Sequence, residues 1–133
     1  MSIMAQNIYI ATPVNARRET TMDEKRSAAY LRVKELEYII SKSVNGAEFA
    51  EFHSAFDGDI VPIRLAPNKL PSEAVIMGKC VQRVMECDMV VFDHGWTSSK
   101  GCKVEHQTAF EYEKEIYSVN WDGSVYTIDK TIF

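Results

Sequence analysis

Cysteine is scarce in this sequence of 133 residues, and the few cysteines form no motif. Cys80, Cys87 and Cys102 are an odd number and include no C-x-x-C pair. If Cys80 and Cys87 share a helix, the rise between them is about 10 Å, which is too long for a disulfide. We therefore expect buried, reduced thiols, as in a cytoplasmic protein.

The sequence also lacks a strong charge of one sign and a long apolar run. A formal net charge of −4 gives no electrostatic footprint for duplex nucleic acid or an anionic membrane. No apolar run is long enough to span a bilayer. Residues 1–13 show no basic region before a long apolar segment, so we expect no signal peptide. The hydrophobic fraction of 46% is ordinary for a globular protein, and we expect one domain over residues 1–133.

What the sequence does contain is an alternation of strand and helix patterns. Residues 8–11 are a short β-prone run that ends at Pro13, and we expect them to form the first, central strand. Thr21 and Glu24 make a T-x-x-E capping box, which predicts a helix start. Apolar residues then recur at helical spacing until Asn45-Gly46, where the helix is predicted to end.

Residues 47–70 have no clear pattern. Phe49, Phe52 and Phe56 fit either an irregular segment or a strand. Residues 60–63 are compatible with a further short strand, in which Pro62 favours a strand end or an edge.

The second half returns to regular patterns. Ser72 is a plausible N-cap for a helix whose broad apolar stripe runs to Cys87, which suits packing against a sheet or a subunit. The later elements are a buried strand at 89–92, a helix from about 101 to 114, a strand at 116–119 and a hairpin at Asp122-Gly123. The alternation predicts a three-layer α/β domain with a mainly parallel sheet.

The stretch 87–112 carries the candidate chemistry. A buried strand leads through a polar loop into a helix start, and open α/β sheets bind ligands at such places. Glu105 lies in the first turns of that helix, on one face with Cys102, Ala109 and Tyr112. Displacement at an anomeric carbon needs an ionised carboxylate, and an ordinary Glu pKa of about 4.3 supplies one at neutral pH. The alternative is a first-turn glutamate that only complements the helix dipole.

Three motifs resemble the nucleoside 2-deoxyribosyltransferase-like superfamily. Residues 8–13 read IYIATP, similar to the family's I-Y-[IL]-A-G-P with Thr12 in place of glycine. Residues 87–91 read CDMVV, similar to its C/A-D-x-V-V strand. Residues 95–106 match G-W-x-x-S-x-G-x-x-x-E-H, the pattern of an uncharacterised bacterial and phage branch. The resemblance covers roughly residues 8–117, apart from the middle segment.

The resemblance implies a flavodoxin-like or Rossmann-like fold, assembly into homo-oligomers, and cleavage of the N-glycosidic bond of nucleosides or nucleoside monophosphates without a cofactor. The family's nucleophile stands four residues after the loop glycine, which makes it Glu105 after Gly101. Six residues before it, the transferases carry aspartate and the monophosphate hydrolases a phosphate-binding serine, here Ser99. Tyr9 matches a tyrosine of the hydrolase pocket. We therefore expect a nucleotide or nucleoside as ligand, and Ser99 favours the nucleotide.

Some positions depart from the family. Cys80 stands where the hydrolases have an aspartate, and Pro13 and Asn15 stand where they have a serine and an arginine. These departures favour a second hypothesis, a nucleotide-binding module that keeps the pocket without turnover. A third hypothesis is a structural oligomer that uses the helix face 76–87 as its contact surface.

The remaining candidates each have a structural alternative. Trp96 either stacks on a base or packs over the sheet edge or a subunit. Asp93, at the end of its strand, is the better candidate to contact a base or leaving group, whereas we expect Asp88, at the strand's start, to cap or pair structurally. Arg17 or its neighbour Arg18 supplies a phosphate-binding cation or lies in solvent.

Ser99 and Gly101 either present a hydroxyl and backbone N–H groups to a phosphate or ribose, or only cap the helix. Tyr9 either faces the pocket or is a half-buried strand tyrosine. Cys102 and His106 stand four residues apart, but no second pair at ligand spacing accompanies them, so we expect no metal site.

Overall fold

The computed structural model describes residues 6–14, 17–61 and 71–131. Five strands form one sheet in the order β2-β1-β3-β4-β5. The strands are β1 (Asn7–Ala11), β2 (Glu51–Ser54), β3 (Met89–Phe92), β4 (Glu115–Trp121) and β5 (Tyr126–Lys130). The helices are α1 (Met22–Ser43), α2 (Glu73–Glu86) and α3 (Lys100–Glu111). Pairing is parallel throughout except in the β4–β5 hairpin, which is antiparallel.

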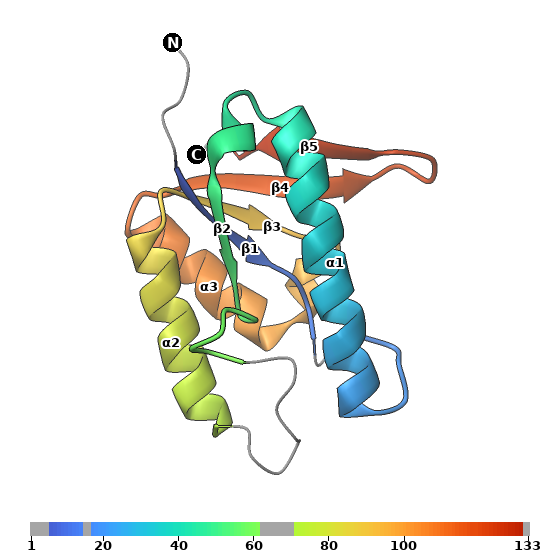
Figure 1. Cartoon of the computed structure of the whole chain (residues 1–133), viewed down its shortest axis with the longest axis vertical. Coiled ribbons are helices and arrows are strands. Elements are labelled where there is room, and N and C mark those ends of the chain that lie inside the picture. Colours follow the sequence, from blue (N-terminus) through green and yellow to red (C-terminus); the bar gives the residue numbers. More distant parts are fainter. Residues whose placement is uncertain (1–5, 15–16, 62–70, 132–133) are drawn as a thin grey trace.

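The two central strands are apolar because both faces of the sheet are covered. Tyr9 lies on one face, and its neighbours Ile8 and Ile10 lie on the other, as alternation along a strand requires. The face with Ile8 and Ile10 packs against α1, and the face with Tyr9 packs against α2 and α3 (Figure 1). The predicted three-layer α/β architecture with a C-terminal hairpin is thereby confirmed. The strand order is that of flavodoxin-like folds, with the switch point between β1 and β3, and Rossmann-like folds share the same layered α/β architecture.

The predicted helix starts are confirmed by their caps. The Thr21 hydroxyl accepts a hydrogen bond from the Glu24 N–H at 3.1 Å, and the Ser72 hydroxyl accepts one from the Val75 N–H at 3.3 Å. Helix α1 ends at Ser43, and the chain then reverses through Gly46, whose φ of 87° suits glycine. Helix α3 ends at Glu111, earlier than the predicted end at about residue 114, and the chain forms a turn directly after it.

The segment with no clear pattern contains the edge strand β2. Phe52 lies in this strand, whereas Phe49 is exposed in a 3₁₀ turn before it. The sequence predicted a strand at 60–63, but the first two of these residues do not lie in a strand. Ile60 and Val61 are buried but follow a turn in which the Val61 N–H donates to the Ala55 carbonyl. The other two, Pro62 and Ile63, lie outside the described residues.

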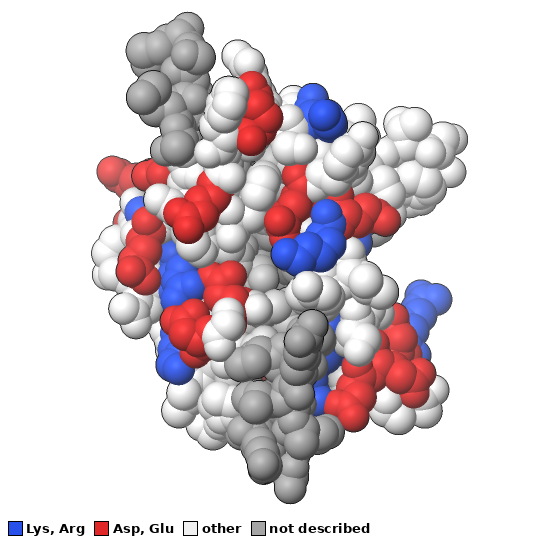
Figure 2. Space-filling view, viewed as in Figure 1, with Lys and Arg blue, Asp and Glu red and all other residues white. Residues whose placement is uncertain are grey.

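Acidic and basic side chains are interspersed over the face seen in Figure 2. Such mixing fits the small net charge of the sequence and gives that face no field of one sign. In the described ranges, no helix combines the length and the apolar character needed to cross a membrane.

Candidate functional site

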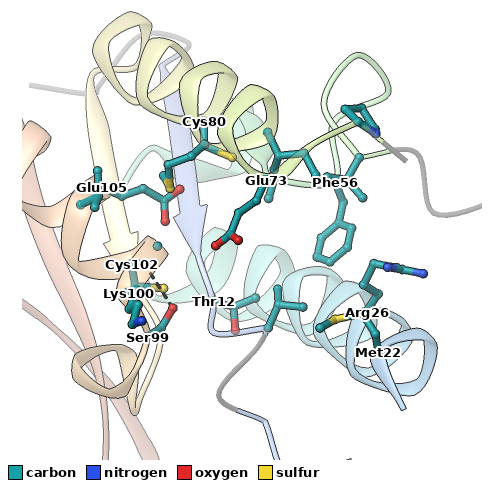
Figure 3. Close-up of a pocket in the computed structure, with 18 of the residues that line it drawn as sticks. Thr12, Met22, Arg26, Phe56, Glu73, Cys80, Ser99, Lys100, Cys102 and Glu105 are labelled. Atoms are coloured by element: carbon teal, nitrogen blue, oxygen red, sulfur yellow. Dashed lines mark hydrogen bonds between the residues drawn. The ribbon is translucent and has the colours of Figure 1, made fainter. Parts of the chain in front are cut away.

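A pocket of about 830 Å³ lies at the carboxyl ends of β1 and β3, the edge at which open α/β sheets bind ligands. Its volume is in the range typical of small-molecule sites. One wall comes from residues 98–105 at the start of α3, and another from residues 71–80 along α2. Thr12, Val14, Met22, Arg26, Ala55, Phe56 and Val61 complete the lining (Figure 3).

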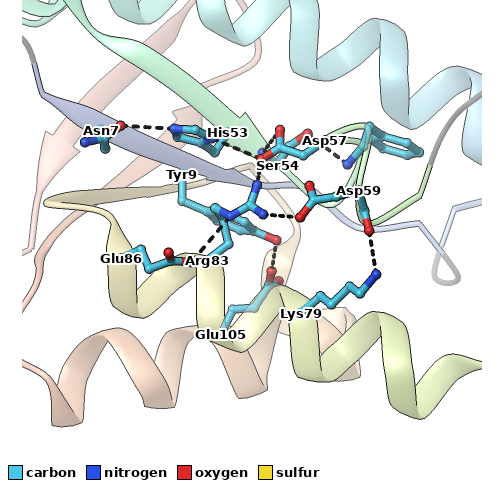
Figure 4. Close-up of polar contacts among 11 residues, drawn as sticks. Asn7, Tyr9, His53, Ser54, Asp57, Asp59, Lys79, Arg83, Glu86 and Glu105 are labelled. Carbon is cyan, nitrogen blue, oxygen red and sulfur yellow. Dashed lines mark hydrogen bonds and ion pairs between the residues drawn. The ribbon is translucent and has the colours of Figure 1, made fainter.

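Glu105 is the buried charged residue of this pocket. Its side chain is 6% exposed, and it sits on the face of α3 that carries Cys102 and Ala109 toward the sheet. The Tyr9 hydroxyl, from β1, donates a hydrogen bond to Glu105 Oε2 (Figure 4). The carboxylate points into the cavity (Figure 3), and its second oxygen accepts no hydrogen bond from any described residue. One carboxylate oxygen is thus held, and the other is available to a ligand.

The protonation of Glu105 differs from the sequence-based expectation. Burial raises the pKa of Glu105 to about 7, and the hydrogen bond from Tyr9 acts in the opposite direction. The pKa of Tyr9 is also raised well above its ordinary value, because the hydroxyl is buried and lies beside Glu105. The assumption of an ordinary, fully ionised glutamate at neutral pH is therefore wrong. A carboxyl group with a pKa near 7 in a pocket is typical of functional sites.

Two cysteines flank this carboxylate. Cys80 from α2 and Cys102 from α3 both line the pocket, and both are free, as predicted. Burial, and next the neighbouring Glu105, raise the pKa of each thiol to about 12. Both are therefore neutral at physiological pH and form a small, weakly polar wall around Glu105.

The start of α3 presents polar groups to the pocket. The Ser99 hydroxyl caps the helix by accepting a hydrogen bond from the Cys102 N–H at 3.3 Å, so the capping alternative is correct for Ser99. Ser99, Lys100 and Gly101 still line the pocket, which keeps them available to a ligand. A Cβ added at Gly101 would meet Met77 Sδ at 3.7 Å, an ordinary contact, so packing alone does not require glycine there.

Asp93 is buried next to the lining residue Thr12 and does not itself line the pocket. Its carboxylate receives hydrogen bonds from Arg32, at 2.8–3.2 Å, and from the Thr12 hydroxyl at 2.6 Å. The Arg32 guanidinium is covered by the ring of Tyr126, 4.5 Å from its centroid. Asp93 therefore holds the end of β1 in place, and Thr12 is its link to the pocket. Asp88 pairs with the Asn7 N–H at 3.0 Å, the structural role expected for it.

Two other predicted binding residues also lie away from the pocket. The ring of Trp96 stacks on His106 at a centroid distance of 4.3 Å and an interplanar angle of 12°, and it contacts Phe92 at 5.2 Å. The packing alternative thus describes Trp96. Arg17 pairs with Glu19 at 3.2 Å. Neither Trp96 nor Arg17 lines the pocket.

Residues 55–61, which supply the opposite wall, are held by a polar network between β2 and α2 (Figure 4). Arg83 pairs with Asp57 and, at 2.6 Å, with Asp59. The His53 ring contacts Asp57 at 3.0 Å and the Asn7 side chain at 3.1 Å. The network fixes the position of this loop relative to α2.

Arg26 and Glu73 line the pocket but were not predicted from the sequence. Arg26 is one helical turn after Met22, another lining residue, and it pairs with Asp23. Glu73 opens α2 and shares a face with Met77 and Cys80, so the spacing i, i+4, i+7 was the signal for it. Among the described residues, no group of three or more His, Cys, Asp or Glu side chains is placed to hold a metal ion.

The strand order and the pocket define a flavodoxin-like α/β domain with a buried carboxylate at its switch point. The chain belongs to the DUF4406 family, described as a domain of unknown function, whose model matches residues 6–118. The chain matches no curated protein.

Proposed function

We propose that this protein cleaves the N-glycosidic bond of a nucleotide or nucleoside, with Glu105 as nucleophile, as the nucleoside 2-deoxyribosyltransferase-like enzymes that its motifs resemble do. The observation that carries the proposal is the state of Glu105: a buried carboxylate in a ligand-sized pocket, with one oxygen bound by Tyr9 and the other directed into the cavity. That arrangement is the one a positioned nucleophile needs.

In the proposed reaction, the free oxygen of Glu105 attacks the anomeric carbon of the sugar. The bond from that carbon to the base nitrogen breaks, and its electron pair leaves with the base. The glycosyl ester on Glu105 is then released by water or by a second base. Tyr9 keeps the other carboxylate oxygen in place and stabilises its charge through both steps.

The lining residues suit a nucleotide. The N–H groups at the start of α3 and the Lys100 ammonium favour a phosphate or a ribose hydroxyl. Met22, Phe56 and Ile76 supply an apolar wall against which a base can stack or pack.

We propose a cytoplasmic homo-oligomer without cofactor, to which duplex nucleic acid and membranes do not bind. The free, buried cysteines support the cytoplasm as its location.

A second candidate function is a nucleotide-binding module without turnover. The observation in its favour is the neutral Cys80 thiol beside Glu105, at a position where the hydrolases carry a carboxylate. In this case the pocket binds the nucleotide, but the bond to the base stays intact.

The test is incubation of the protein with a panel of nucleosides and nucleoside monophosphates, followed by chromatography for free base. The enzyme hypothesis predicts base release by the wild type and none by Glu105→Gln. Base release by Glu105→Gln at the wild-type rate rejects Glu105 as nucleophile. Calorimetric binding of a nucleotide without base release supports the binding module instead.

A further inference from the structure

We propose that the base of the substrate is a positively charged ring, as in a pyridinium nucleotide, and that Glu73 recognises its charge. This inference rests on the function proposed above and names the class of substrate. A base that is cationic while bound to the sugar leaves as a neutral molecule, because it keeps the electron pair of the broken bond. Such a leaving group needs no proton, whereas a neutral base leaves as an anion unless an acid protonates it.

The groups beside Glu105 are poorly suited to protonate a leaving base. The Tyr9 hydroxyl is committed to Glu105, and burial raises its pKa well above the ordinary value. The thiols of Cys80 and Cys102 line the pocket, but burial raises the pKa of each to about 12. Glu105 itself must be ionised to attack the sugar. This surrounding therefore favours a substrate whose base leaves without a proton.

Glu73 supplies a negative charge to the same pocket. It is the first residue of α2 and is exposed, and an exposed carboxyl group is ionised at neutral pH. Its carboxylate points into the cavity from the α2 side (Figure 3). No ion pair among the described residues involves Glu73, and Arg26, a cation of the same lining, pairs with Asp23 instead. The Glu73 carboxylate is thus available to a cationic ligand.

The rest of the lining suits a flat cationic ring joined to a sugar phosphate. A cation is attracted to the face of an aromatic ring, and Phe56 enters the pocket on the side of Glu73 (Figure 3). Ser99 and Lys100 line the pocket from the start of α3, where a phosphate is favoured. The pocket therefore presents charges of both signs, and a pyridinium nucleotide carries both signs too.

The proposed reaction balances without an acid. A Glu105 oxygen bonds to the anomeric carbon while the bond from that carbon to the ring nitrogen breaks. The electron pair stays on the nitrogen, which makes the ring neutral. Water then attacks the anomeric carbon, and the ester bond breaks with its electron pair on the Glu105 oxygen. The proton of the water passes to solvent, so each turnover releases one proton.

The experiment compares nicotinamide mononucleotide with its 1,4-dihydro form, which has nearly the same size but a neutral ring, and with AMP, GMP, CMP and UMP. Chromatography measures the free base. We expect the wild type to release nicotinamide with a kcat/KM about 10²-fold or more above that for any neutral-base nucleotide, because these lack the help of an acid. Glu73→Gln should raise the KM for nicotinamide mononucleotide about tenfold and change kcat little, because it removes a charge that binds the ring.

The matched control is Glu86→Gln, at the other end of α2 and outside the pocket lining, which should behave as the wild type. Cleavage of the neutral-base nucleotides as fast as nicotinamide mononucleotide, or cleavage of them alone, would overturn this inference and leave the proposed function standing. An unchanged KM in Glu73→Gln would overturn the role of Glu73. If the wild type releases base from none of these nucleotides, the proposed function fails as well.

Discussion

Tyr9 and Glu105 stand 96 positions apart in the sequence, and the Tyr9 hydroxyl donates a hydrogen bond to the Glu105 carboxylate inside the protein. The contact joins the central strand β1 to helix α3, so the geometry of the carboxylate depends on the packing of that helix on the sheet. Burial favours the neutral carboxyl, and the hydrogen bond favours the charged one. The balance of these two effects sets the pH range in which Glu105 can act.

The activity of the wild type should rise with pH through about 7. A nucleophilic glutamate works as the carboxylate, and burial raises the pKa of Glu105 to about 7. Below that value the neutral form dominates, and kcat/KM should fall about tenfold per pH unit. A profile of base release from pH 5 to 9 at limiting substrate measures it. A profile that is flat down to pH 5 would contradict a carboxyl group with this pKa as nucleophile.

Tyr9→Phe should move that profile to higher pH. Without the hydroxyl, the charged form of Glu105 loses its hydrogen-bond donor among the described residues, so the pKa of Glu105 rises further. Activity at pH 7 should drop about tenfold or more and recover partly at pH 9. Tyr38→Phe is the control, because Tyr38 is 67% exposed on α1. If Tyr9→Phe lowers activity by the same factor at every pH, Tyr9 does not act through the pKa of Glu105.

Glu105 should also make stability depend on pH. Its folded-state pKa of about 7 lies above the unfolded value, so its neutral form favours folding at low pH. That contribution is complete below the unfolded pKa and is lost as the pH rises through about 7. Urea titration therefore compares the free energy of unfolding of Glu105→Gln with that of the wild type at each pH. The value for Glu105→Gln minus the value for the wild type should grow from pH 5 to 8, starting from its value at pH 4. A constant difference would contradict the raised pKa.

Breaking the ion pair between Arg32 and Asp93 should destabilise the fold. Arg32→Met leaves the Asp93 carboxylate, which is 4% exposed, without its cation, and the loss should be about 3 kcal/mol. Lys34→Met is the control, since Lys34 pairs with Glu37 at the surface of the same helix and should change stability by less than about 1 kcal/mol. Urea titration measures both variants. A loss in Arg32→Met no larger than the control's would show that the pair contributes little.

Much of the fold followed from local signals in the sequence. Thr21 and Ser72 marked helix starts because an N-cap acts on its own first turn. The alternation of Ile8, Tyr9 and Ile10 placed the tyrosine on the opposite face from the two isoleucines. The edge strand β2 was ambiguous because it has only four residues and depends on pairing with β1.

Residues of the candidate site that belong to sequence motifs could be predicted. Residues whose positions depend on tertiary contacts could not. Glu105, Ser99 and Thr12 lie in motifs and do line the pocket. Asp93 was expected to face a ligand, but Arg32, 61 positions earlier, binds it. Trp96 stacks on His106, ten residues later, because the 3₁₀ turn before α3 and the helix itself bring the two rings together. No local pattern shows such partners.

The most direct measurement is a search for a glycosyl ester on Glu105. A 2-fluoro sugar nucleotide slows release of the ester, because fluorine destabilises the positive charge that develops at the anomeric carbon. After incubation with such nucleotides, mass spectrometry of the digested protein should find the sugar phosphate on the peptide that contains Glu105, and no adduct in Glu105→Gln. Release of base with an adduct on another residue, or with none at all, would contradict the account.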